Sequence, residues 1–290
     1  MPRFGARSID VSKKKISLSE IKTSRETGRK LAMITVYDYP MARLVDQSDI
    51  EMILVGDSVG MVIQGLDSTV PVTMREMLYH TTMVRRGAPN TFIVGDMCYM
   101  SYQACEKEAI HNAGLLMQAG ADCIKIEGNR HQASKIEAVA KAGIPVMGHI
   151  GLTPQTAGAL GGFKLQGKDL ESAKLLIEDA LAFEAAGAFA LDLECLPTAL
   201  TKVINEKVSI PTISVGAGPD CAGYNLNAYD ILGMFDAFVP KFVKQYAQTG
   251  QDIVKAFNAW RKDIEDRQYP LAEHSFNTGA EEIGRLYGGK

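Results

Sequence analysis

Several short apolar segments of this 290-residue chain end in an ionisable or metal-binding side chain. The segments are residues 53–58, 93–96, 124–127, 146–149 and 191–194. Short apolar runs of this kind are typical of buried parallel strands. In a barrel of parallel strands, the carboxyl ends converge on one face, where active sites lie. The pattern therefore predicts a catalytic site at which consecutive strands each deliver a polar side chain.

Two aspartates, Asp57 and Asp96, are the strongest candidates for ligands of a hard cation. Mg²⁺ binds one or two protein carboxylates, keeps some of its waters and leaves room for substrate oxygens. Glu127 ends the next segment and is placed to complete the site or to reach it through a water. The alternative is that each aspartate caps the following helix. We favour the metal site because Gly56 and Gly95 precede the aspartates and let the backbone approach a ligand.

Three further side chains suit work on a substrate. Lys125 shares a strand face with Glu127, and it suits neutralising a substrate carboxylate or enolate, or forming a Schiff base. Glu194 has apolar neighbours and suits a general base. His149 suits polarising a substrate oxygen, binding a metal or holding the next loop. For each of the three the alternative is a structural ion pair or hydrogen bond.

Alternating strand and helix patterns must position these residues. Strands are expected at residues 31–36, 52–55, 92–94, 123–126, 145–148, 188–193 and 211–215. Apolar residues three to four apart predict helices at residues 40–48, 74–86, 101–119, 131–142, 170–186, 198–207 and 251–265. Gly120, Gly143 and Gly187 directly follow three of these helices, as helix-ending glycines do. The order predicts βα units and a parallel sheet.

The expected architecture is one (βα)8 TIM barrel domain over residues 1–290, with a short N-terminal extension and a C-terminal tail. The eighth strand is ambiguous between residues 237–239 and 242–244. A doubly wound open sheet is the alternative, but consecutive strands that all end in functional groups fit a closed ring better. The Gly- and Thr-rich segment 151–167 follows the fifth strand and is placed to act as a lid.

Composition excludes several classes of protein. Apolar residues make up 46% and charged residues 22%, as in an average soluble domain. A net charge of -3 gives no support for nucleic acid or an anionic membrane as partner, and no apolar run approaches the ~20 residues of a membrane span. The five widely spaced cysteines predict reduced thiols in a cytoplasmic protein. The basic N-terminus lacks the apolar region of a secretion signal, and a short organelle presequence is the alternative.

The residues alone indicate enolate chemistry on a 2-oxo acid. A divalent ion chelated by such an acid polarises its carbonyl, and a carboxylate removes the neighbouring proton while the metal stabilises the enolate. Aldol-type additions, lyases and C–C or C–P rearrangements all use these steps. The pattern of residues does not choose among them.

Several longer phrases resemble the ketopantoate hydroxymethyltransferase family. They are residues 35–40, 55–61, 67–74, 84–89, 114–117, 125–128, 144–155 and 240–244. The resemblance implies a barrel of the phosphoenolpyruvate/pyruvate type. It also implies transfer of a hydroxymethyl group from 5,10-methylenetetrahydrofolate to 3-methyl-2-oxobutanoate through a Mg²⁺-stabilised enolate. The product would be 2-dehydropantoate, for pantothenate biosynthesis, and the protein a cytoplasmic homo-oligomer, a decamer being typical of the family.

The same resemblance implies a role for each candidate residue. The Mg²⁺ ligands would be Asp57 and Asp96, with Glu127 nearby. The keto acid would be bound by Asp57, Ser58, Asp96, Lys125 and His149. The proton acceptor would be Glu194.

Two segments depart from the family pattern, at residues 98–100 and 224–229. In the second, Asn225 and Asn227 stand where the family has apolar residues, and Tyr229 stands where it has histidine. This segment follows the seventh strand and is expected to border the mouth. Two alternatives follow: a lyase or mutase-like enzyme acting on another 2-oxo acid, and a non-catalytic paralogue. The intact acidic and lysine positions favour the hydroxymethyltransferase.

Overall fold

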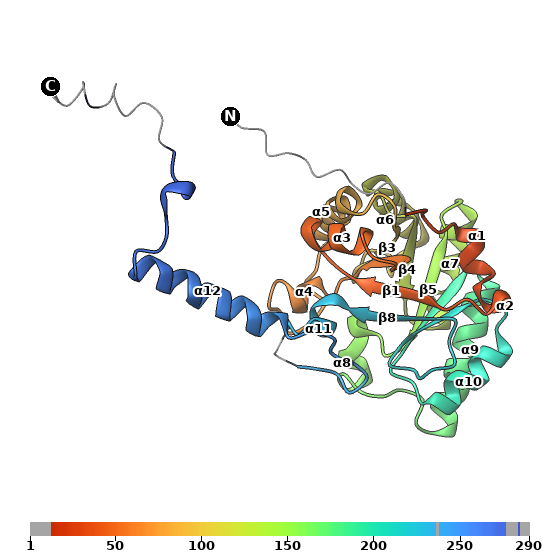
Figure 1. The fold of residues 1–290 in the computed structure, drawn as a ribbon. Coiled ribbons are helices and arrows are strands. Elements are labelled where there is room, and N and C mark those ends of the chain that lie inside the picture. Colours follow the sequence, from red (N-terminus) through yellow and green to blue (C-terminus); the bar gives the residue numbers. More distant parts are fainter. Residues whose placement is uncertain (1–12, 236–237, 277–283, 285–290) are drawn as a thin grey trace.

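The structure, a computed structural model, describes residues 13–235, 238–276 and 284 and is built on a closed barrel of parallel strands. The strands are β1 (Leu31–Thr35), β2 (Met52–Val55), β3 (Phe92–Asp96), β4 (Cys123–Glu127), β5 (Val146–Gly151), β6 (Ala190–Glu194), β7 (Thr212–Val215) and β8 (Gly223–Asn227). Each strand pairs with the next, and β8 closes the ring on β1 (Figure 1). The predicted (βα)8 barrel is confirmed and the doubly wound sheet is excluded.

Helices follow most of the strands and cover the outside of the barrel (Figure 1). The α-helices are α1 (Leu18–Lys22), α2 (Ser24–Thr27), α3 (Tyr39–Asp46), α4 (Val59–Val62), α5 (Met74–Gly87), α6 (Glu106–Ala119), α7 (Ala133–Lys141), α8 (Ala157–Leu160), α9 (Leu170–Ala185), α10 (Thr198–Lys207), α11 (Ala228–Ile231) and α12 (Thr249–Glu265). Short 3-10 turns lie at η1 (Arg130–Gln132), η2 (Pro154–Thr156) and η3 (Ala272–His274).

The helix expected at residues 101–119 is shorter than predicted. It begins at Glu106, after bends at residues 101–104, where the Ser101 hydroxyl donates to the Cys98 carbonyl oxygen at 2.7 Å. The helix ends as expected at Gly120, whose φ of 112° is open to glycine but strained for other residues.

The prediction of the eighth strand was wrong. β8 is formed by residues 223–227, whereas residues 242–244 have no strand structure. Of the other candidate, Phe238 and Val239 are not in a strand, and residue 237 lies outside the described residues. The strand was missed because its inward-facing positions carry Asn225 and Asn227, so no apolar run marks it.

The inside of the barrel is apolar at one end and charged at the other. The apolar end is a buried cluster that contains Phe92 and Val94 of β3, Cys123 of β4 and Met147 of β5. Residues two apart in a strand share a face. The same rows therefore continue toward the carboxyl ends of the strands with polar side chains, beginning with Asp96 after Val94.

The segment just before β1 and the helix α12 after β8 are placed differently relative to this barrel. Ile16 and Ile21 are buried in the apolar cluster and close the amino ends of the strands. In contrast, α12 runs away from the barrel (Figure 1), and none of its residues is buried. Among the described residues, no helix is both long and apolar enough to cross a membrane.

Two glycine positions test this packing. A Cβ at Gly148 of β5 would lie 2.5 Å from the ring of the fully buried Phe183, so Gly148→Ala should lower the free energy of unfolding by about 1–3 kcal/mol. A Cβ at Gly114 of α6 would meet nothing within 4 Å, so Gly114→Ala should raise it by about 0.5–1 kcal/mol. Urea unfolding of both variants checks the pair, and equal effects would contradict this packing.

Candidate active site

The residues predicted from the sequence come together at the carboxyl ends of β2 to β6. Strand register places Asp96 beside Lys125, and Glu127 beside His149. These four residues are all at least 96% buried: their exposed fractions are 1%, 4%, 2% and 1%. Glu194 is more open, with 19% of its side chain exposed, so its carboxylate reaches the accessible part of the mouth.

A chain of polar contacts links these side chains. The Lys125 Nζ atom lies 3.1 Å from Asp96 Oδ2 and 3.2 Å from His149 Nδ1. On its other side, the His149 ring approaches Glu127 Oε2 with Nδ1 at 3.5 Å and Glu194 Oε2 with Nε2 at 3.3 Å. Lys125 and His149 therefore form the centre of the site, with carboxylates around them.

The carboxylates keep this histidine charged. Burial and the Lys125 charge oppose protonation of the ring, but Glu127 and Glu194 outweigh them and raise the pKa of His149 to about 10. Burial opposes the charge of Lys125 as well, yet Asp96 and the other acids raise its pKa. These shifts favour the charged forms of the two side chains, and the His149 ring lies beside the Glu194 carboxylate.

Asp57 and Asp96 lie next to each other and have too few positive partners. The Asp57 amide donates to Asp96 Oδ2 at 3.2 Å. Burial and the charges of Asp96 and Glu127 raise the pKa of Asp57 well above its usual range. Asp96 Oδ1 and Glu127 Oε2 are buried without a hydrogen-bond partner. Unpaired oxygens and mutual repulsion of this kind are what a divalent cation would relieve.

The described residues contain no group of three Asp, Glu, His or Cys side chains arranged to hold a metal ion. Asp57 and Asp96 are the adjacent acids that offer oxygens to a cation, and Mg²⁺ characteristically takes its remaining ligands from water and substrate. Glu127 Oε1 instead accepts from the main-chain amide of Gln155 at 2.8 Å.

Gln155 is a residue of this site that the sequence reasoning missed. It lies in η2, after β5, and is only 4% exposed. Its Nε2 donates to Asp57 Oδ2 at 2.9 Å and to the Met97 carbonyl oxygen at 2.8 Å. The Tyr102 hydroxyl donates to its Oε1 at 2.9 Å. Gln155 thus ties the start of the segment 151–167 to an expected metal ligand, while the closing motion of that segment stays a prediction.

Asp192 was also missed, although a signal was present. It precedes Glu194 by two residues in β6 and therefore points into the barrel with it. It is 1% exposed, and its Oδ1 has no hydrogen-bond partner. Burial raises the pKa of Asp192 to about 6, although His149 and Lys125 oppose the shift. Asp192 adds one more negative charge beneath the two cations.

The cysteines take no part in this site as reactive groups. None of the five is in a disulfide in the structure. Cys98 is buried close to the mouth, and burial raises its thiol pKa to about 12. A thiol with such a pKa stays protonated and is a poor nucleophile or metal ligand.

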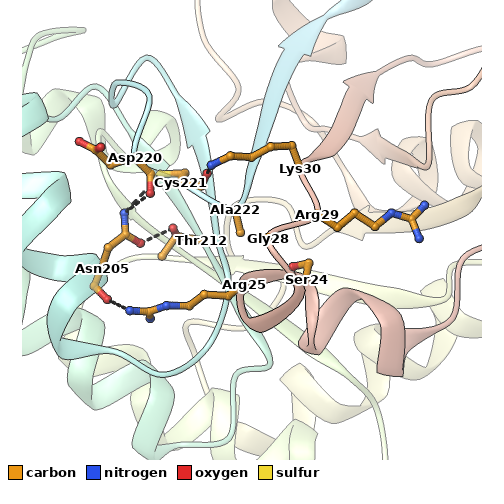
Figure 2. Close-up of a pocket in the computed structure, with 10 residues that line it drawn as sticks. All are labelled: Ser24, Arg25, Gly28, Arg29, Lys30, Asn205, Thr212, Asp220, Cys221 and Ala222. Carbon is orange, nitrogen blue, oxygen red and sulfur yellow. Dashed lines mark hydrogen bonds between the residues drawn. The ribbon is translucent and has the colours of Figure 1, made fainter.

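A second concave site lies at the opposite end of the barrel. It is a cavity of about 220 Å³ beside the amino ends of β1, β7 and β8, and several of its lining residues are basic (Figure 2). Arg25 and Lys30 donate to the main-chain carbonyl oxygens of Asn205 and Cys221. Arg29 points away from the cavity in Figure 2. The basic groups therefore hold the N-terminal segment against the barrel.

The fold and its acidic mouth define the class of protein, an α/β-barrel enzyme. The fold matches the solved structure of phosphonopyruvate hydrolase with a TM-score of 0.59 and 13% identity, over 93% of this chain and 94% of the other. It also matches 2,3-dimethylmalate lyase, a member of the PEP mutase/isocitrate lyase superfamily, with a TM-score of 0.58 and 14% identity, over 94% and 92% of the two chains.

Sequence comparison gives the family. Residues 15–272 match ketopantoate hydroxymethyltransferase. The chain is 54% identical over 272 residues to the 3-methyl-2-oxobutanoate hydroxymethyltransferase of Heliobacterium modesticaldum, which covers 93% of this chain and 99% of that protein. It is 47% identical to the enzyme of that name from Carboxydothermus hydrogenoformans, over 94% and 99% of the two chains. The chain belongs to the ketopantoate hydroxymethyltransferase family. It is a hydroxymethyltransferase of pantothenate biosynthesis, as the sequence predicted. The sequence match favours this activity over the two alternatives, a lyase or mutase-like enzyme and a non-catalytic paralogue.

The contacts of Gln155 predict a measurable effect on the cation binding expected of Asp57. Gln155→Leu removes the donor to Asp57, and loss of such an outer contact typically reduces metal affinity or activity about 10- to 100-fold. The activity should be measured against Mg²⁺ concentration, with a thermal melt for stability. Gln47→Leu is the control, because the exposed Gln47 side chain only donates to Arg43 at the end of α3. An unchanged Mg²⁺ dependence in Gln155→Leu would refute the assigned role.

Proposed function

We propose that the mouth of the barrel transfers a hydroxymethyl group from 5,10-methylenetetrahydrofolate to 3-methyl-2-oxobutanoate. The C3–H bond of the keto acid breaks and a bond forms from C3 to the one-carbon unit. Water supplies the hydroxyl oxygen, and tetrahydrofolate and 2-dehydropantoate leave. The observation that carries the proposal is the continuous chain of contacts from Asp96 through Lys125 and His149 to the partly exposed Glu194.

Asp57 and Asp96 would hold Mg²⁺, with Glu127 nearby. The support for this is the raised pKa of Asp57 and the unpaired buried oxygens of Asp96 and Glu127. When bound, the ion would polarise the keto group and make the C3 proton more acidic.

Glu194 would accept the C3 proton. Its carboxylate is the most open of the acids at the centre of the site, and the His149 Nε2 atom lies 3.3 Å from its Oε2. A base that is both oriented and accessible is what abstraction of a carbon-bound proton requires. His149 would therefore act on the keto acid chiefly by positioning Glu194.

Lys125 and Ser58 would bind the keto acid. Lys125 brings a positive charge to the mouth, which attracts the substrate carboxylate. Ser58 is the N-cap residue of α4, and its side chain makes no capping hydrogen bond to that helix. Its hydroxyl is thus available to a carboxylate oxygen. The aspartates would contact the keto acid through the cation that they share.

We also propose that the protein assembles with further copies of itself. One face of α12 carries an apolar stripe at helical spacing, formed by Ile253, Phe257, Trp260 and Ile264. Phe257 is 65% exposed and Trp260 is 56% exposed. The loop between β7 and β8 contains no helix, so the outer face of β8 is left partly bare, with Tyr224 37% exposed. A second copy would cover the apolar stripe of α12 and the bare face of β8. The proposed location of the protein is the cytoplasm, which the unpaired cysteines support.

Matched substitutions separate the base from the metal ligands. Glu194→Gln should slow deuterium exchange at C3 of 3-methyl-2-oxobutanoate about 10²–10⁴-fold while the affinity for the keto acid is kept. Asp96→Asn should instead weaken Mg²⁺ and keto acid together, because one cation would join them. Exchange rates by NMR and binding by calorimetry check both. Exchange that persists in Glu194→Gln would contradict its role.

The apolar stripe predicts how the assembly depends on α12. Replacing both Phe257 and Trp260 by glutamate should lower the mass in solution, because charges would then lie in the contact. Light scattering measures the mass, and circular dichroism checks that the barrel stays folded. Lys262→Gln, on the same helix, is the control and should leave the mass unchanged. A wild-type protein that is monomeric at micromolar concentration would end this proposal.

A further inference from the structure

Tyr37 lies between the mouth of the barrel and the seam where β8 meets β1. It follows β1 by two residues and is fully buried. Its hydroxyl oxygen is 2.8 Å from the Ser58 hydroxyl and 2.6 Å from Asn227 Nδ2. Tyr37 thus connects a side chain of β8 to the serine that would bind the keto acid.

The direction of these hydrogen bonds is fixed by Asn227. Its Oδ1 accepts from the Tyr229 amide at 3.0 Å and caps α11. The amide nitrogen must then face Tyr37, and an amide nitrogen only donates. The Tyr37 oxygen therefore accepts from Asn227, and among the described residues Ser58 is the one acceptor within reach of the single Tyr37 hydroxyl hydrogen.

The consequence falls on Ser58. Because its oxygen accepts from Tyr37, its own hydrogen is free to be donated elsewhere. Within the described part of the chain, Tyr37 is the only side chain or backbone group in hydrogen-bond contact with the Ser58 hydroxyl oxygen. Burial raises the pKa of Tyr37, so its hydrogen is kept at neutral pH. The free Ser58 hydrogen suits an acceptor such as a carboxylate oxygen.

Tyr229 holds this arrangement in place. Its ring stacks on that of Tyr37, with centroids 5.8 Å apart and planes 29° apart. Its hydroxyl donates to Asp38 Oδ2 at 2.6 Å, and Asp38 Oδ1 accepts from the Met41 amide to cap α3. The loops after β8 and β1 are thus tied together around Tyr37. Both residues that do this, Asn227 and Tyr229, are departures from the family pattern.

We propose that Tyr37 is a positioning residue for the 2-oxo acid. By donating to Ser58, Tyr37 leaves the Ser58 hydroxyl to donate to the substrate carboxylate. Asn227 sets the direction of the hydrogen bonds, and Tyr229 fixes the ring. The inference rests on the proposed function, because it requires the keto acid to bind at Ser58.

The test compares Tyr37→Phe, Asn227→Val and Ser58→Ala in the full-length protein. Tyr37→Phe should raise the KM for 3-methyl-2-oxobutanoate about tenfold, as expected for a hydrogen bond that serves a charged group. The kcat and the KM for 5,10-methylenetetrahydrofolate should change little. Asn227→Val should raise the same KM severalfold, because the Tyr37 hydroxyl is then free to accept from Ser58.

A double variant distinguishes positioning from loss of packing. Tyr37→Phe combined with Ser58→Ala should bind the keto acid no more weakly than Ser58→Ala alone, because Tyr37 acts through Ser58. Additive losses, accompanied by a lower melting temperature, would instead indicate a structural role and overturn the inference. Tyr224→Phe is the matched control, since the Tyr224 hydroxyl donates to the Pro219 carbonyl oxygen on the outside of the barrel.

Calorimetric binding of the keto acid separates the two possible failures. If Ser58→Ala leaves the affinity unchanged, the assignment of Ser58 fails and the inference fails with it. If Ser58→Ala weakens binding but Tyr37→Phe and Asn227→Val do not, the proposed function stands and only the inference is overturned.

Discussion

Buried charge at the mouth of the barrel is the constraint that the rest of the structure has to accommodate. Removing an ion from water costs several kcal/mol unless it is paired and hydrogen-bonded. Here two cations, Lys125 and His149, lie among a larger number of carboxylates. These acids are Asp57, Asp96, Glu127, Asp192 and Glu194. Burial, together with the charges of Asp96 and Glu127, raises the pKa of Asp57, and the excess of negative charge leaves room for one more positive group.

A parallel barrel tolerates this arrangement because its interior is layered. One row of side chains runs from Phe92 and Val94 to Asp96, so the apolar part of the strand packs the core before the charged part begins. The folding energy comes from the apolar layer and from the helices outside. The strand ends are then held rigidly on all sides, which is the condition for keeping like charges close together.

The sequence predicts most of this arrangement because the rule of two-residue alternation is local. An apolar run that ends in Asp, Lys or Glu specifies both a buried strand and the side chain at its mouth. The same rule contained the signal for Asp192, since it shares a face with Glu194. It could not predict Gln155, which lies in a loop turn and reaches Asp57 only through the folded chain.

The eighth strand shows where local patterns fail. Its inward positions are polar, so hydrophobic periodicity gives no strand signal, although the backbone pairs in register with β1 over the whole of its length. The strand is specified by its partners instead: its Asn225 accepts from the buried Thr35 hydroxyl at 3.2 Å. Information of this kind is non-local and cannot be read from one segment alone.

This seam joins the closure of the barrel to the binding of substrate. A closed barrel requires the last strand to fit the first residue by residue, and a one-residue slip would turn every side chain to the wrong face. The polar contacts from β8 to Thr35 and Tyr37 penalise such a slip, because it would leave buried polar groups without partners. The same contacts determine what Tyr37 offers to Ser58. A change in β8 can therefore alter the binding of the keto acid while every charged residue of the mouth stays in place.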